Sequence, residues 1–387
     1  MQGSTLITAQ DSFTNNGGIL VSGNTINITA SNILFDALSH GGHYNGKEGD
    51  KNNQYNNIVS TSSLIAGGGI TLTAQNNLSL LGTSLLTGSL DMNAGGDILI
   101  GAVNEINNIN LGEDFHSYNQ TATSSNIIVN NNTNITAGGS FTLTSGQNIQ
   151  DVHSVTTSSS GGFFGGETTT TSDTYILTNV SSNIVTGGNL SITSNKDLSI
   201  IASNVQAKED ITLTSKDKDV NIIAGVDKDF QKVESTSSSS FAGTQIKGEH
   251  EIDSNYKETI ISSNITAGSS IIINSGSNIN ILASNLQGMN GNLTASNDIN
   301  ILSQEQLSES FHYLQETGLS LGAMALGAAV AVGVTVATSG AGAVAVAGLG
   351  GAWTGSKAQE GDIDFNTETT LEFISTTLKY PNSLTLA

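Results

Sequence analysis

The chain has 387 residues, of which 36% are apolar, so it is long enough to bury a substantial core. It carries 33 acidic residues against 12 basic ones, a net charge of −21, and all the basic residues are lysine. This balance and the lack of arginine argue against a nucleic-acid-binding groove, and the lack of cysteine excludes disulfides, thiolate nucleophiles and cysteine-bound metals.

Short apolar strands begin close to the N-terminus and are separated by glycine, asparagine and serine. The segments GGILV at 17–21 and INI at 26–28 place aliphatic side chains at alternate positions, which point to the same face of a strand. The first residues, MQGSTLITAQDSF, contain neither a basic nor an apolar stretch, so they do not form a signal peptide. We therefore expect an exported form of this chain to be part of a longer protein.

The same arrangement of apolar positions recurs about every 21 residues. The stretch SSNIVTGGNLSITSNKDLSIIASNVQ at 181–206 returns 81 positions later as SSNITAGSSIIINSGSNINILASNLQ at 262–287. Leu286 follows Ile265 by 21 positions, and Ile299 follows Ile279 by 20. Helical repeats are longer and have an inner period of 3.6, and an antiparallel sandwich does not return to the same phase.

This period predicts an all-β fold, a parallel β-helix with three strands in each coil, over residues 1–303. Equivalent aliphatic side chains, such as Ile265 and Leu286, then stack inside the coil at the strand spacing of ~4.8 Å. Glycine pairs precede strands at 67–68, 138–139 and 187–188, where we expect φ > 0 at a corner. The recurring asparagine and serine fit the turns, where their side chains form ladders along the axis.

Four polar inserts separate blocks of roughly two coils, near 37–60, 103–133, 151–180 and 225–260. The third contains GGFFGG between Ser/Thr runs, and the fourth has a serine run before Phe241. We expect hairpins that project from the solenoid, with Phe163, Phe164 and Phe241 at tips that contact a partner. The alternative is that these rings fold back and extend the solenoid core.

The third insert and the coil after it, SSSGGFFGGETTTTSDTYILTNVSSNIVTGGNLSITS, resemble the hemagglutinin repeats of filamentous hemagglutinin and of contact-dependent growth inhibition exoproteins. The resemblance covers about residues 1–303. It implies a right-handed parallel β-helix, two-partner secretion through a dedicated outer-membrane protein, and display on a Gram-negative cell. In the inhibition systems this region is associated with moving a C-terminal toxin across a target cell's outer membrane.

The resemblance brings no catalytic residues, because the repeats of those proteins carry none. Two features of the resembling proteins are missing from this sequence: the N-terminal secretion domain and the Val-Glu-Asn-Asn motif that introduces the toxin.

The chain changes character after residue 303. In QEQLSESFHYLQET at 304–317, Leu307, Phe311 and Leu314 stand at i, i+4 and i+7, which predicts an amphipathic helix. The tail at 357–387 alternates polar and apolar residues enough for one or two short strands.

Residues 318–356 form an apolar, Gly/Ala-rich segment with no charge between Glu316 and Lys357. Its length suits a helix that contacts or crosses a membrane, with an interfacial tryptophan at its end. The candidate membrane residues are Leu319, Leu321, Met324, Leu326, Val330, Val332, Val334, Val336 and Trp353. The alternative is a buried Ala/Gly hairpin that caps the open end of the β-helix.

Candidate catalytic carboxylates are scattered. A β-helix enzyme would place paired acidic side chains on facing coils, often beside arginine or lysine. We interpret the acidic residues as solvated turn carboxylates, namely Asp97, Asp197, Asp210 and Asp219.

Histidine provides little support for a metal site. His40 and His43 form a close pair without a third ligand. Single histidines are expected in surface loops or on the amphipathic helix, namely His116, His153, His250 and His312. We therefore predict no catalytic residue, no cofactor and no metal site.

Together these features predict a non-catalytic, secreted segment on the outer surface of a Gram-negative bacterium. Its expected role is adhesin-like cell contact, with delivery of a C-terminal toxin across a target-cell membrane as a further role. The expected partners are a receptor on a host or neighbouring bacterial cell, an outer-membrane secretion partner, and a target membrane through 318–356. The alternative function is a carbohydrate-active β-helix enzyme, a lyase or glycosidase.

Overall fold

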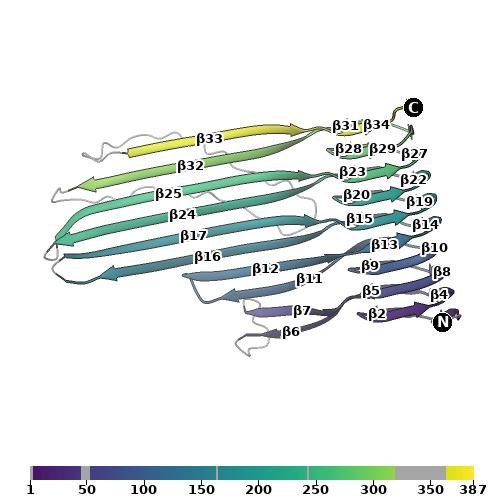
Figure 1. The fold of residues 1–387 in the computed structure, drawn as a ribbon, viewed down its shortest axis with the longest axis horizontal. Helices are drawn as coiled ribbons and strands as arrows, with labels where there is room; N and C mark the ends of the chain where they lie inside the picture. The colour runs from purple at the N-terminus through teal and green to yellow at the C-terminus, as the bar shows by residue number, and fades with distance from the viewer. Residues whose placement is uncertain (1–2, 45–52, 163, 242–243, 319–362) are drawn as a thin grey trace.

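The structure is a computed structural model that describes residues 3–44, 53–162, 164–241, 244–318 and 363–387. Every helix or strand assigned in these ranges is a β-strand. Short strands stack into a solenoid at one side of the molecule, and long hairpins project from it toward the other side (Figure 1). None of the described residues forms a helix with the length and apolarity needed to cross a membrane.

Three parallel ladders make up the solenoid. The first contains β1 (Thr5–Thr8), β4 (Thr25–Ala30), the second halves of β8 (Ser63–Ala74) and β10 (Ser84–Ala94), β14 (Thr133–Ala137), β19 (Leu190–Ser194), β22 (Ile211–Ser215), β27 (Ser270–Ser275), β30 (Asn290–Ala295) and β35 (Ser383–Leu386). The second contains β3 (Ile19–Ser22), the first halves of β8 and β10, β13 (Asn126–Val129), β18 (Asn183–Thr186), β21 (Asn204–Ala207), β26 (Asn264–Ala267), β29 (Asn285–Gln287) and β34 (Thr377–Lys379).

The third ladder contains β2 (Ser12–Asn16), β5 (Asn32–Asp36), β9 (Leu78–Leu81), the first part of β11 (Ile98–Asn110), β15 (Phe141–Thr144), β20 (Leu198–Ile201), β23 (Val220–Ile223), β28 (Ile279–Leu282) and β31 (Ile299–Leu302). The chain visits the ladders in turn, so each coil has three sides. The structure thereby confirms the predicted parallel β-helix.

The solenoid core consists of aliphatic columns that run along its axis. Ile265 lies directly opposite Leu286 in the ladder, and both are fully buried, as the repeat predicts. Adjacent coils are not all 21 residues apart, because Ile271 faces Gly291 and Ile273 faces Leu293, each 20 positions later. Aliphatic side chains stacked on one another fill most of the core, and each buried aliphatic side chain contributes about 1.5–3 kcal/mol.

The glycine pairs serve a purpose other than the expected positive φ. None of Gly67, Gly138 and Gly187 has φ > 0. A Cβ at Gly138 would lie 2.3 Å from the carbonyl oxygen of Gly95 in the preceding coil, and one at Gly187 would lie 2.1 Å from that of Asn130. These corners require glycine because adjacent coils approach too closely for a side chain.

The projecting hairpins join into one antiparallel sheet, which we call the hairpin sheet. Its strands follow chain order: β6 (Leu38–His43), β7 (Gln54–Ser60), the second part of β11, β12 (Phe115–Ser124), β16 (Gly146–Ser160), β17 (Phe164–Val180), β24 (Gly225–Phe241), β25 (Thr244–Ile261), β32 (Gln304–Gly318) and β33 (Ile363–Ile374). Each inner hairpin thus pairs with the hairpins before and after it, and the first and last hairpins form the edges of the sheet.

Coils with hairpins are interspersed with coils that lack them. Third-ladder strands β5, β11, β15, β23 and β31 lead into hairpins, whereas β2, β9, β20 and β28 turn directly into the next strand. The direct corner has one residue with positive φ, namely Gly17 (66°), Gly82 (55°), Ala202 (45°) or Ala283 (44°). Because a hairpin adds two strands, one hairpin for about every two coils lets both sheets keep the same ~4.8 Å spacing.

A buried hydroxyl closes the corner where each hairpin rejoins the solenoid. The residues are Ser62, Ser125, Ser182 and Ser263. In the last coil the half-buried Thr376 takes this position and donates to the carbonyl oxygen of Leu302. Ser125 Oγ lies 2.7 Å from the carbonyl oxygen of Gly101 and accepts the backbone N–H of Thr83 at 3.0 Å. The hydroxyl therefore gives the backbone N–H of Thr83 an acceptor at the corner where the hairpin departs.

The predicted helix at 304–317 is wrong, because these residues form strand β32. β32 pairs with β25 on one side and with β33 on the other, so the sheet satisfies its backbone hydrogen bonds. The tail forms β33, β34 and β35, and the last two strands stack on β29 and β30. Except for Gly318, which ends β32, the apolar segment 318–356 lies outside the described residues.

Candidate interaction surface

The two faces of the hairpin sheet carry different side chains. Residues directly opposite each other in an antiparallel pair point to the same face. One row across the sheet consists of Tyr118, Asp151, Tyr175, Phe230, Tyr256 and Glu309. A row on the opposite face contains Val233, Asp253, His312 and Asn366. We name these the tyrosine face and the acidic face.

Hydroxyl groups on the tyrosine face are held by the residue two positions further along the same strand. Tyr118 donates to Gln120 at 2.9 Å, Tyr256 to Glu258 at 2.7 Å, and Tyr313 to Gln315 at 2.8 Å. Burial raises the pKa of all three tyrosines, and the Glu258 hydrogen bond raises the pKa of Tyr256 further. The hydroxyls therefore stay protonated and fix the rings along the strands, as an interaction surface requires.

Three histidines on the tyrosine face pair with carboxylates on neighbouring strands, and the first, His116, lies 3.7 Å from Asp151. His153 Nδ1 lies 2.5 Å from Asp173 Oδ1, and the His153 ring stacks on His116 at 5.3 Å. His250 Nε2 lies 2.9 Å from Glu234 Oε1, and Glu234 also binds Lys232 Nζ at 2.8 Å. The expectation of histidines in loops is wrong, since these side chains connect strands of the sheet.

The distal end of the sheet holds two of the predicted contact residues. Phe164 begins β17 and lies opposite Phe241, the last residue of β24. The Phe164 side chain is 72% exposed and is not part of the solenoid core. Phe163 lies outside the described residues, as do all nine candidate membrane residues from Leu319 to Trp353. The structure therefore brings Phe164 and Phe241 together at one tip.

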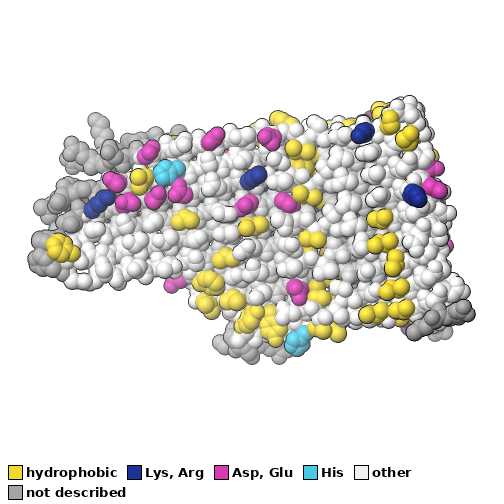
Figure 2. Space-filling model, viewed as in Figure 1, with side chains coloured by type: hydrophobic (Ala, Val, Ile, Leu, Met, Phe, Trp, Pro, Cys, Tyr) yellow, Lys and Arg dark blue, Asp and Glu magenta, His cyan; other side chains and the backbone are white. Residues whose placement is uncertain are grey.

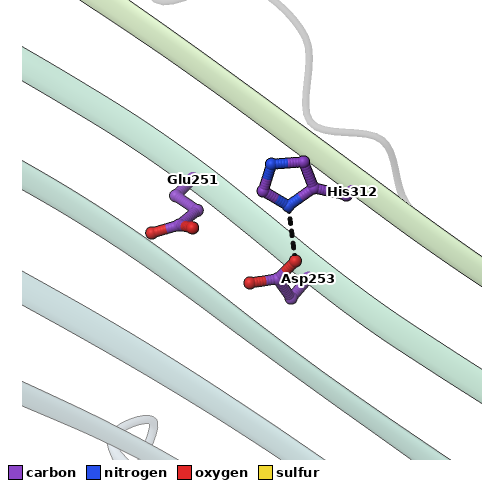
Figure 3. A group of neighbouring side chains, drawn as sticks. All are labelled: Glu251, Asp253 and His312. Carbon is purple, nitrogen blue, oxygen red and sulfur yellow. Dashed lines mark hydrogen bonds and ion pairs between the residues drawn. The ribbon is translucent and has the colours of Figure 1, made fainter. Parts of the chain in front are cut away.

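The acidic face brings Glu251, Asp253 and His312 together (Figure 3). Glu251 and Asp253 lie two positions apart on β25, so they share a face, and Asp253 is directly opposite His312 on β32. His312 Nδ1 lies 2.6 Å from Asp253 Oδ1. This hydrogen bond, together with the charges of Asp253, Glu251 and Asp364, raises the pKa of His312.

Carboxylates dominate this part of the surface. On the face turned to the viewer in Figure 2, they gather over β25, β32 and β33 with one histidine among them. Lys247 lies 3.5 Å from both Glu249 and Glu316, which raise its pKa. Within the described ranges, no lysine lies within ion-pair distance of Glu251 or Asp253.

Amide and carboxylate side chains tie the coils together on the outside of the solenoid. The predicted ladders are confirmed: Asn204 donates to Asn183, Asn264 to Asn204, and Asn285 to Asn264, each at 2.9 Å.

Turn carboxylates cap the backbone of the following coil. Asp97 accepts the backbone N–H of Ser140 and Asp210 that of Ser270, each at 2.8 Å. Asp219 accepts the backbone N–H of Asn278, which lowers the pKa of Asp219. The fourth residue of the set, Asp197, accepts the backbone N–H of Asp219 at 3.2 Å. These carboxylates bind backbone groups between coils, which accounts for them without catalysis.

A stripe of exposed aliphatic side chains crosses four coils of the second ladder. It consists of Val21, Ile65, Leu86 and Ile128, each opposite the next. Stacked apolar side chains on the outside of a solenoid form a second candidate contact surface.

A groove of about 410 Å³ lies where the hairpin sheet meets the third ladder. Its described lining includes Leu81, Leu99, Gln120, Asn179 and Val226, and none of its lining residues is ionisable. The groove therefore offers no acid or base for hydrolysis or elimination at this junction.

The sequence did not reveal the cluster of Glu251, Asp253 and His312. The carboxylates and the histidine lie 59 to 61 positions apart, in segments expected to be an insert and a helix. Only the register of β25 against β32 brings them together. The single sequence feature that points to this cluster is the pair Glu251 and Asp253, two acidic residues two positions apart, and it is a weak signal.

Comparison with known proteins identifies one family. A family model described as "Hemagglutinin repeat" matches residues 36–113, 163–252 and 244–370. Searches of curated proteins and of solved structures gave no significant match. Each match runs from one hairpin to another and includes the coils between them.

Proposed function

The chain belongs to the hemagglutinin-repeat family, and from this premise we propose that it is a non-catalytic segment of a secreted, surface-exposed adhesin. The observation that carries the proposal is the hairpin sheet, which projects from the solenoid toward the other side of the molecule (Figure 1). Its distal end carries the exposed Phe164. The solenoid acts as the support and the hairpin sheet as the contact surface.

The proposed setting is the outer surface of a Gram-negative bacterium. There the segment would be part of a two-partner-secreted exoprotein, exported through an outer-membrane partner, that contacts a receptor on a host or neighbouring bacterial cell. A further role in toxin delivery would use residues 318–356 against the target-cell membrane, since that segment is uncharged as far as Lys357.

The composition of the solenoid surface supports an adhesin over a carbohydrate-active enzyme. Outward positions of the first ladder form a column of threonine and asparagine, with Thr29, Thr73, Asn93 and Thr136 opposite one another. A glycosidase or lyase needs paired carboxylates on facing coils. The turn carboxylates instead bind backbone N–H groups.

The first test exchanges an exposed apolar residue at each of two hairpin tips. We expect Phe164→Ser to reduce binding of the labelled chain to bacterial and epithelial cells several-fold, because it removes an aromatic contact at the distal end. Flow cytometry measures binding, and circular dichroism verifies the fold.

Leu111→Ser is the matched control, because Leu111 is 75% exposed at the tip between β11 and β12. It should leave cell binding unchanged. Equal binding by wild type and Phe164→Ser would show that this tip is not the contact, and no binding by wild type to either kind of cell would contradict the adhesin.

A further inference from the structure

The cluster on the acidic face has the geometry of a three-ligand site. One ligand atom from each of Glu251, Asp253 and His312 can be chosen so that all lie within 4.8 Å of one another. The carboxylates come from alternate positions of β25 and the imidazole from the opposite position of β32, so all three point to the same side (Figure 3). The ladder hydrogen bonds of β25 and β32 hold the backbone positions of these residues.

The charge around the cluster favours a cation. Asn366 on β33 lies opposite His312, and Asp364, two positions away on the same strand, adds a third carboxylate to this face. Two lysines of β25 share this face: Lys247 is engaged by Glu249 and Glu316, and Lys257 lies four positions from Asp253 and opposite Ser308. A single imidazole thus faces several carboxylates without a lysine partner.

We propose that Glu251, Asp253 and His312 bind a divalent transition-metal ion, with Zn²⁺ the best match. Imidazole nitrogen combined with carboxylate oxygen suits zinc and its neighbours, whereas Ca²⁺ and Mg²⁺ prefer six or more oxygen ligands. The ion would replace the proton shared by His312 and Asp253 and would take its remaining ligands from water or Asp364.

Among the residues that the structure describes, no other histidine joins such a group of three possible ligands. Glu234, the partner of His250, is already neutralised by Lys232 at 2.8 Å. His250 therefore has one engaged carboxylate, whereas His312 has two that no lysine neutralises. This difference makes His250 the internal control for His312.

Binding would have a structural consequence. β25 belongs to the fourth hairpin and β32 to the fifth, so an ion between Asp253 and His312 would clamp the two hairpins together. The amides of β32 should then exchange with solvent more slowly.

The test titrates the chelator-treated full chain with Zn²⁺ and follows binding by calorimetry. Co²⁺ serves as the spectroscopic probe, because its visible absorption reports nitrogen and oxygen ligands. We expect one Zn²⁺ per chain and slower hydrogen exchange in β32. His312→Ala should weaken binding by about tenfold or more, as loss of a ligand or its support does, and Asp253→Asn should do the same.

His250→Ala is the matched control and should bind Zn²⁺ like wild type. The proposal is overturned if wild type binds no Zn²⁺, if His312→Ala binds as well as wild type, or if His250→Ala loses as much affinity. Binding of Ca²⁺ in preference to Zn²⁺ would contradict the metal class. These measurements use no cells, so their result is independent of the adhesin test.

Discussion

At the residue scale, the corner after the third ladder is the most demanding position in the solenoid. In coils without a hairpin, a single residue turns the chain with φ between 44° and 66°. This conformation costs an L-residue roughly 1–2 kcal/mol, and glycine avoids the cost. Ala202 and Ala283 nevertheless occupy it, and both are fully buried. Burial of the alanine methyl group offsets part of the backbone cost there.

Gly82→Ala should destabilise the chain by about 2 kcal/mol. The new residue would have to adopt φ near 55°, and its Cβ would lie 2.5 Å from Val103 Cγ2 and 3.0 Å from the carbonyl oxygen of Thr123. Urea denaturation followed by circular dichroism measures the change.

Ala202→Gly is the comparison for this prediction, because it relieves the same backbone cost while removing one buried methyl group. Its effect should stay within about 1 kcal/mol. If Gly82→Ala unfolds at the same urea concentration as wild type, the corner does not require glycine.

At the element scale, the solenoid and the hairpin sheet are held to a common spacing. The solenoid advances one strand per coil and a hairpin supplies two strands, so hairpins are omitted from β2, β9, β20 and β28. A hairpin on every coil would crowd the sheet, and fewer hairpins would break it into pieces with open edges.

Excising residues 145–181 and inserting one glycine should preserve the solenoid but split the hairpin sheet. The new corner would copy the one at Ala202, between Ile201 and Ser203. β12 and β24 would then stand three strand spacings apart, ~14 Å, which is too far to pair. Because this creates two new open edges, we expect the variant to self-associate in size-exclusion chromatography with light scattering.

The control excision removes residues 37–61, again with one glycine in their place. That hairpin lies at the edge of the sheet, so its loss moves the edge to β11 without adding a new one. This variant should stay in the oligomeric state of wild type. Self-association of both variants to the same extent would contradict the shared-spacing explanation.

At the scale of the whole molecule, the last hairpin differs from the others because residues 319–362, most of them in the uncharged segment, lie between its two strands. β32 ends at Gly318 opposite Lys247, and β33 begins at Ile363 opposite Gln315, toward the distal end of the sheet. The uncharged segment 318–356 is therefore attached on the same side of the molecule as the tip at which Phe164 and Phe241 lie opposite each other. A cell surface contacted by the tip would lie close to both attachment points.

Trp353 is the only tryptophan of the chain, so intrinsic fluorescence reports on this segment alone. If 318–356 enters a bilayer, zwitterionic liposomes should shift the emission of the full-length chain to shorter wavelength and protect it from acrylamide, because the indole leaves water. Zwitterionic lipid avoids repulsion by the net charge of −21.

Trp353→Phe should abolish the tryptophan signal and so verifies its origin. If emission and quenching are identical with and without liposomes, the proposed membrane entry of 318–356 is contradicted, whereas the proposed cell contact is not.

The sequence by itself determined the solenoid. In coils without a hairpin, equivalent aliphatic residues recur every 20 to 22 positions, and only a stack of parallel coils can bury all of them, as the pairing of Ile265 with Leu286 shows. The tertiary structure alone decided β32, because the spacing of Leu307, Phe311 and Leu314 suits a helix but β25 and β33 offer the backbone hydrogen bonds of a sheet. It also decided the cluster of Glu251, Asp253 and His312. Cross-strand register depends on where each hairpin leaves the solenoid, and no local pattern of residues records that.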